Sequence, residues 1–161
     1  ESIETIGEAT GKVEEAKTLI NEMDEKVAEI KEKAKNVTET KKVLFEIDPT
    51  SGLYVAGKNT FLDEMLSIIN AENIIDEEGW LMVDQESIIS KNPDVIITTY
   101  GSYVEGAVEQ VKERDGWQDI TAVKDDAVYD IESDLVTLPG PRLVEGVEEV
   151  AKVVYPEIFG E

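Results

Sequence analysis

The feature that most constrains this chain is a long amphipathic helix pattern near its start. Apolar residues recur at alternating spacings of three and four, at Val13, Ala16, Ile20, Met23, Val27, Ile30 and Ala34, which is the pattern of a helix with one apolar stripe. A helix over residues 13–35 would be about 35 Å long at about 1.5 Å per residue, longer than one small domain needs. Two interpretations stay open: a coiled-coil dimer, or a helix that packs along a domain and projects past it. We expect the second.

After a polar linker the pattern changes to short apolar runs that alternate with helical segments. We predict strands at 42–47, 94–98 and 127–131, and helices at 61–70, 85–90, 105–113 and 141–155. Such alternation predicts an α/β fold, a three-layer, Rossmann-like lobe with a mostly parallel sheet. Ligands of such sheets bind at the carboxyl ends of the strands. The loops after Ile47, Ile97 and Ile131 are therefore the candidate binding loops.

Local signals set the expected ends of these elements. Thr60 and Asp84 are predicted N-caps, because a side-chain oxygen there can accept from a backbone N–H in the first turn. Residues 50–59 are expected to form a loop, and Pro156 is expected to end the last helix. Trp117 is expected in the core, and Arg142 is expected to have a structural role near the start of the last helix.

The composition excludes several functions. The net charge is -22, with 37 acids against 15 bases, which disfavours binding to nucleic acid and to anionic lipid. The chain has no Cys and no His, so this chain can supply no thiolate or imidazole metal ligands, and haem ligation by His is excluded at least from this part of the protein. Only two arginines occur, Arg114 and Arg142, which disfavours a strongly anionic ligand.

The sequence also lacks the motifs of common enzymes and of membrane spans. It has no G-x-G-x-x-G after a strand, no G-x-x-x-x-G-K-[ST] and no G-x-S-x-G. We expect no catalytic residues, no metal and no resident cofactor. No run of about 18 apolar residues is present, and the opening residues do not resemble a signal peptide. If the protein is secreted, its export segment is expected to lie outside this sequence.

Several stretches together resemble one family, the class III substrate-binding proteins of ABC importers for cobalamin, haem and ferric siderophores. They follow the family's order along the chain and are residues 6–16 (IGEATGKVEEA), 56–66 (AGKNTFLDEML) with 72–74 (ENI), 87–97 (SIISKNPDVII), and 140–151 (GPRLVEGVEEVA) with 155–159 (YPEIF). The resemblance covers essentially the whole chain. It identifies residues 1–36 as the long inter-lobe connector helix and residues 37–161 as the C-terminal lobe, with the N-terminal lobe preceding residue 1.

The resemblance implies a function and a location. Such a protein captures a cobalamin-like or metal-chelate nutrient outside the cytoplasm, in the periplasm or anchored on the outer cell surface, and delivers it to a permease as a monomer. The expected ligand is cobalamin or a related corrinoid; haem and a ferric siderophore are alternatives. A receptor or sensor domain that dimerises through the long helix is the alternative from another class.

The resemblance also assigns candidate site residues. Glu86 matches the glutamate that this lobe presents to arginines of the permease. Trp80 matches a ligand-facing tryptophan of cobalamin-binding relatives, and a flat amphipathic ring suits packing on a macrocycle. Tyrosines in the first two binding loops fit an apolar ligand wall with hydroxyl groups, and the family's third ligand loop follows the third strand; the candidates there are Tyr54, Tyr100, Tyr103, Asp134 and Leu135. Relatives often carry an aromatic residue where this chain has Leu135.

Overall fold

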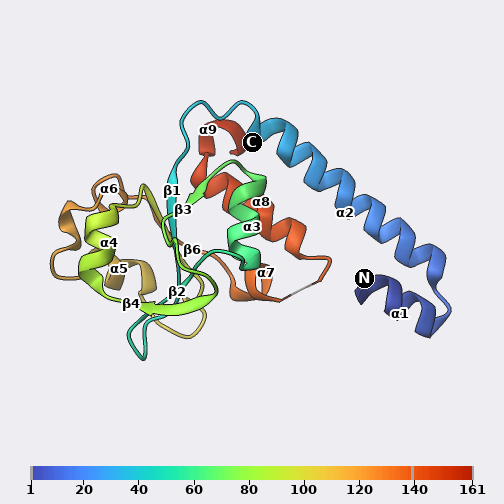
Figure 1. The fold of residues 1–161 in the computed structure, drawn as a ribbon, viewed down its shortest axis with the longest axis horizontal. Helices are drawn as coiled ribbons and strands as arrows, with labels where there is room; N and C mark the ends of the chain where they lie inside the picture. Colours follow the sequence, from blue (N-terminus) through green and yellow to red (C-terminus); the bar gives the residue numbers. More distant parts are fainter. Residues whose placement is uncertain (1, 139, 161) are drawn as a thin grey trace.

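The computed structural model describes residues 2–138 and 140–160. Two helices open the chain, α1 (Ser2–Thr10) and α2 (Val13–Ala34), and α1 folds back beside α2 (Figure 1). Gly11 makes the turn with φ of 72°, and Gly7 lets the two helices meet, since a Cβ on Gly7 would lie 2.6 Å from Cβ of Ala16. The predicted connector over residues 1–36 is therefore two helices and not one. Its separation from a lobe at 37–161 stays a prediction.

The apolar stripe of α2 is used within the chain. Its C-terminal half packs on the lobe: Ile30 and Ala34 are buried, and Met23 and Val27 are half-buried against the same core. Its N-terminal end is more open, with Val13 40% exposed. This arrangement agrees with a helix that packs along a domain and projects past it (Figure 1).

The sheet contains the three predicted strands and three further strands that were not predicted. Its strands are β1 (Lys42–Asp48), β2 (Leu53–Ala56), β3 (Glu72–Asn73), β4 (Trp80–Val83), β5 (Val95–Thr98) and β6 (Val128–Asp130). The order is β4-β2-β1-β5-β6, and β3 also pairs with β1. The strands β1, β5 and β6 are parallel, with Glu46, Thr98 and Asp130 in register. The expected loop at 50–59 is wrong in part, because β2 lies within it and pairs antiparallel with β1 and β4.

Helices cover both faces of the sheet, so the predicted three-layer α/β fold is confirmed. One face carries the end of α2 with α3 (Phe61–Ile68), α7 (Ser133–Thr137), α8 (Leu143–Val154) and α9 (Pro156–Phe159). The other carries α4 (Gln85–Lys91), α5 (Ala107–Lys112), the 3-10 turn Trp117–Asp119 and α6 (Thr121–Lys124). Side chains of β1 alternate between the two cores, with Phe45 in the first and Leu44 in the second. Trp117 is fully buried, as expected.

Both predicted N-caps are confirmed. The Thr60 hydroxyl accepts from the Asp63 N–H at 3.2 Å, and the Asp84 carboxylate accepts from the Ser87 N–H at 2.7 Å. The last helix ends at Val154, and Pro156 begins the short α9. Within residues 2–138 and 140–160, none of the helices combines the length and apolarity that a membrane crossing requires.

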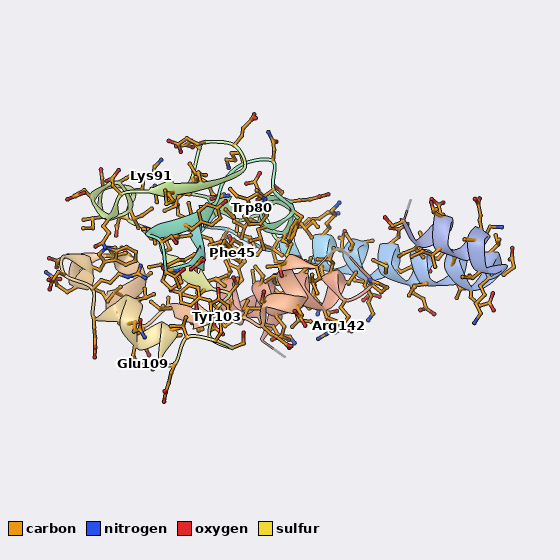
Figure 2. The ribbon with its side chains drawn as sticks, turned by 90° about the horizontal axis from the view of Figure 1, so that it is seen from below. Phe45, Trp80, Lys91, Tyr103, Glu109 and Arg142 are labelled. Atoms are coloured by element: carbon orange, nitrogen blue, oxygen red, sulfur yellow. The ribbon has the colours of Figure 1, made fainter. Side chains whose placement is uncertain are left out.

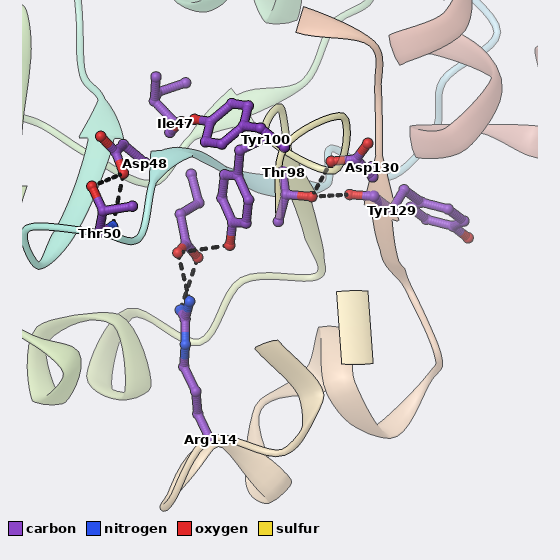
Figure 3. A network of polar contacts seen from close by, with 10 residues as sticks. Ile47, Asp48, Thr50, Thr98, Tyr100, Arg114, Tyr129 and Asp130 are labelled. Atoms are coloured by element: carbon purple, nitrogen blue, oxygen red, sulfur yellow. Dashed lines mark hydrogen bonds and ion pairs between the residues drawn. The ribbon is translucent and has the colours of Figure 1, made fainter. Parts of the chain in front are cut away.

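A charged side chain lies inside the second core. Glu46 on β1 is fully buried, and among the described residues it is the only charged side chain in that state. Arg114, which follows α5, donates two hydrogen bonds to it, from Nη1 to Oε2 at 2.8 Å and from Nη2 to Oε1 at 2.6 Å. The guanidinium also lies over the Trp117 ring, 4.6 Å from its centroid. The pair ties the central strand to the α5 layer (Figure 3).

We expect Arg114→Ala to lower the free energy of unfolding by about 3 kcal/mol, because Glu46 would keep a buried charge without its cation. Arg142→Ala is the matched control, since Arg142 is exposed and its ion pairs with Glu132 and Glu145 are long, at 3.8 and 3.6 Å. That change is expected to cost far less. Urea unfolding followed by circular dichroism measures both, and equal losses would contradict a special role for the buried pair.

Candidate functional site

The carboxyl ends of the parallel strands form one edge of the sheet. β1 ends at Asp48, β5 at Thr98 and β6 at Asp130. β4 runs in the same direction as β1, because both are antiparallel to β2, so the start of α4 lies at this edge too. Figure 2 looks onto this side of the molecule and labels Tyr103 and Trp80. Trp80 is the first residue of β4, opposite Ala56, and so lies further back from the edge than Val83, the last residue of that strand. We call this side the carboxyl edge.

Two tyrosines in the loop between β5 and α5 have opposite environments. Tyr103 is 61% exposed, and its hydroxyl lies 3.4 Å from the backbone oxygen of Ile47, to which it donates. Tyr100 is 1% exposed, and its hydroxyl donates to Glu46 Oε1 at 2.9 Å. The expectation that Tyr100 faces a ligand is corrected by this burial, since its polar atom is already used inside the core. Tyr103 is the tyrosine that this loop presents.

Asp130 anchors the same loop from β6. Its Oδ1 accepts from the Thr98 hydroxyl at 2.6 Å (Figure 3) and from the Gly101 N–H at 2.8 Å. A side chain at position 101 would not fit, because a Cβ there would lie 2.3 Å from Asp130 Oδ2. The close approach of loop and carboxylate therefore depends on glycine.

The carboxylates also change the acidity of the phenol. Partial desolvation raises the pKa of Tyr103 above its ordinary value, and the nearby Asp48 and Asp130 carboxylates raise it further. The Tyr100 pKa is raised more strongly by burial and then by Glu46. Both phenols are therefore protonated at neutral pH, and Tyr103 can donate a hydrogen bond.

The paired strands β2 and β4 supply an apolar surface beside these groups. Trp80 is 40% exposed and packs against Phe61 at the start of α3, with ring centroids 5.6 Å apart. Met82 is 63% exposed and lies on the same face of β4, two residues on, directly opposite Tyr54 of β2. Tyr54 is half-buried. Phe61 and Met82 were not among the predicted site residues. Residues 80–83 are all apolar, so the sequence does not show which face of β4 is exposed.

The candidates after β6 lie on a helix and not on a loop. Asp134 and Leu135 belong to the short α7, where Asp134 is exposed and Leu135 is half-buried against the first core. The backbone oxygen of Leu135 approaches Gly146 of α8 so closely that a Cβ there would be 2.2 Å away. Leu135 thus contributes mostly to packing, whereas Asp134 remains accessible.

Glu86 stands in the first turn of α4, exposed to solvent. Since β4 leads into α4 through the Asp84 cap, Glu86 is held at the outer end of the carboxyl edge. Arg142 is exposed at the start of α8 and makes its ion pairs to Glu132 and Glu145.

The charge of the carboxyl edge is negative. Its acidic residues are Asp48, Asp130, Glu132 and Asp134. Arg114 lies close by but is committed to Glu46, and Arg142 is the other arginine of the chain. Among the described residues, no group of three or more acidic side chains is placed to hold a metal ion.

Comparison with known proteins agrees with this architecture. The sequence matches the periplasmic binding protein family over residues 1–135. It is 45% identical to YvrC of Bacillus subtilis, an uncharacterized ABC transporter substrate-binding lipoprotein. The alignment covers 99% of this chain and 51% of YvrC. The sequence is 25% identical to the high-affinity heme uptake system protein IsdE of Staphylococcus aureus, in an alignment that covers 81% of this chain and 47% of IsdE.

A solved structure gives the same result. A possible iron-binding, periplasmic solute-binding protein from Staphylococcus epidermidis superposes with a TM-score of 0.86 at 34% identity, over 95% of this chain and 60% of the other. The chain spans about half the length of the curated relatives it matches. The Bacillus subtilis and Staphylococcus epidermidis proteins are named as binding proteins, which agrees with the expectation of no catalysis. The match over most of the chain and the shared fold show that this chain belongs to the periplasmic binding protein family.

Proposed function

We propose that this chain is one of two lobes of the substrate-binding protein of an ABC importer, and that its carboxyl edge forms half of the ligand cleft. The observation that carries the proposal is the exposure of two aromatic side chains, Trp80 and Tyr103, at that edge of a family-typical sheet. Trp80 and Met82 are neighbours on one face of β4, and a contiguous exposed apolar patch is a mark of a binding site, whereas single scattered residues are not. The name of the Bacillus subtilis relative supports the assignment to an ABC transporter.

The chemistry of the edge favours a ligand with apolar surface and little negative charge. Trp80 and Met82 offer apolar contact area, and Tyr103 offers a hydrogen-bond donor. The carboxylates of Asp48, Asp130 and Asp134 would repel anionic groups. A corrinoid such as cobalamin, with amide side chains on a large apolar ring, fits this description best.

Haem and ferric siderophores are the alternatives, and relatives favour each. IsdE is named a heme uptake protein, and the Staphylococcus epidermidis protein is named as possibly iron-binding. Haem carries propionates, which the carboxylates of Asp48 and Asp130 would repel, and this chain offers no His to ligate its iron. The raised pKa of Tyr103 disfavours the phenolate that would bind iron.

The remaining residues give the proposed mechanism of delivery. Glu86, held at the outer end of the carboxyl edge, docks on arginines of the permease through a charge-assisted contact.

The protein acts outside the cytoplasm, anchored to the membrane, as the lipoprotein name of the Bacillus subtilis relative suggests. It acts as a monomer, because the C-terminal half of the α2 stripe packs on the lobe and Ala16 packs against α1; this disfavours a sensor that dimerises along the whole of α2.

Ligand binding by the full-length protein tests the ligand class. We expect calorimetry to give tight binding of cyanocobalamin and weak or no binding of haem and of a ferric hydroxamate. Trp80→Ala should weaken binding about tenfold, because one large aromatic contact is lost, and Trp80→Phe should retain part of the affinity. Tight binding of haem alone would contradict the corrinoid assignment, and binding of none of the three would contradict the metal-chelate class.

Docking is tested at Glu86. We expect Glu86→Gln to weaken binding to the cognate permease in nanodiscs about tenfold at low salt, with a smaller effect at high salt, because the contact is charge-assisted. Glu109→Gln is the matched control, since Glu109 is also an exposed glutamate in the first turn of a short helix. Equal effects of the two substitutions would mean that only net charge matters, and docking through Glu86 would be rejected.

A further inference from the structure

We propose that Glu46, Arg114 and Tyr100 form a positioning cluster that holds the β5–α5 loop, so that Tyr103 is presented to the ligand in one fixed orientation. The inference rests on the proposed function, because it assigns a purpose to the orientation of Tyr103. None of the three residues touches the ligand in this account. They act through the loop.

Tyr100 is the point at which the cluster meets the loop. Its side chain is held by its hydroxyl, which donates to Glu46 Oε1 in the core at 2.9 Å. Its backbone oxygen accepts from the N–H groups of Tyr103 at 3.1 Å and Val104 at 2.9 Å. A shift of the Tyr100 side chain would therefore move the turn that carries Tyr103.

The carboxylate of Glu46 is in turn held by Arg114, which donates to both carboxylate oxygens. The backbone of Glu46 is held separately, because its backbone oxygen accepts from the Thr99 N–H at 3.2 Å. Charge-assisted, bidentate bonds have a preferred direction, whereas apolar contacts of the same area do not. A buried ion pair adds little net stability over well-packed apolar residues, so its value here is geometric.

The loop is held from two further directions, which agrees with a surface arranged in advance of binding. Asp130 binds the Gly101 N–H, and the Tyr103 hydroxyl reaches Ile47. The Tyr103 ring also lies near the ring of Tyr100, with centroids 6.3 Å apart. A binding surface that is already ordered loses less conformational entropy on association, which strengthens affinity.

Tyr100→Phe tests the cluster, because it removes one hydroxyl and leaves the Glu46–Arg114 pair in place. Tyr155→Phe is the matched control: Tyr155 is also 1% exposed, and its hydroxyl accepts from Lys41 N–H at 3.0 Å and donates to the Asn70 oxygen at 2.9 Å, at the opposite end of the sheet. Both variants are expected to fold and to lose a few degrees in Tm. Only Tyr100→Phe should speed amide hydrogen exchange at Gly101, Tyr103 and Val104.

Affinity supplies the second readout. In the full-length protein, Tyr100→Phe should weaken cyanocobalamin binding about fivefold to tenfold, while Tyr155→Phe should leave it within about twofold. Unchanged exchange in the loop of Tyr100→Phe would overturn the proposal, and so would faster exchange with unchanged affinity. The exchange measurement needs no ligand, so it judges the cluster even if the wild-type protein binds none of the ligands tried, an outcome that would count against the proposed function instead.

Discussion

The ion pair between Glu46 and Arg114 is the interaction on which the arrangement of the carboxyl edge depends. Glu46 lies on the central strand β1, and Arg114 follows the C-terminal end of α5. A carboxylate with no solvent exposure requires its partners to remain in place. The pair therefore fixes the distance between the sheet and the α5 layer. Through Tyr100 it also fixes the loop between them, which ends at the carboxyl edge.

The same pair determines the charge that a ligand meets. Arg114 is neutralised within the core, and the Arg142 guanidinium lies between Glu132 and Glu145. The edge is left with carboxylates, a protonated Tyr103 and an apolar surface at Trp80 and Met82. Selection of the ligand would then rest on apolar contact and on hydrogen bonds to neutral groups, with anionic groups disfavoured by repulsion.

Much of this fold is predictable because its signals are local. The parallel strands β1, β5 and β6 contain short stretches rich in apolar residues, and the caps at Thr60 and Asp84 are single residues that directly precede helices. The antiparallel pairing of β2 with β4 is not predictable in this way, because these strands are short and are separated by more than twenty residues of chain. The burial of Tyr100 depends on Glu46, 54 positions earlier, and on Arg114 beside it. The break at Gly11 was not predicted, although the regular apolar pattern itself starts only at Val13.

Fluorine NMR of the full-length protein labelled with 5-fluorotryptophan tests the central claim most directly. This chain has two tryptophans, Trp80 exposed at the carboxyl edge and Trp117 buried in the second core, and Trp80→Phe assigns their signals. The account predicts that a bound ligand shifts the Trp80 signal and leaves that of Trp117 in place. A bound ligand that leaves the Trp80 signal unchanged would contradict the assignment of the carboxyl edge as the ligand-binding face.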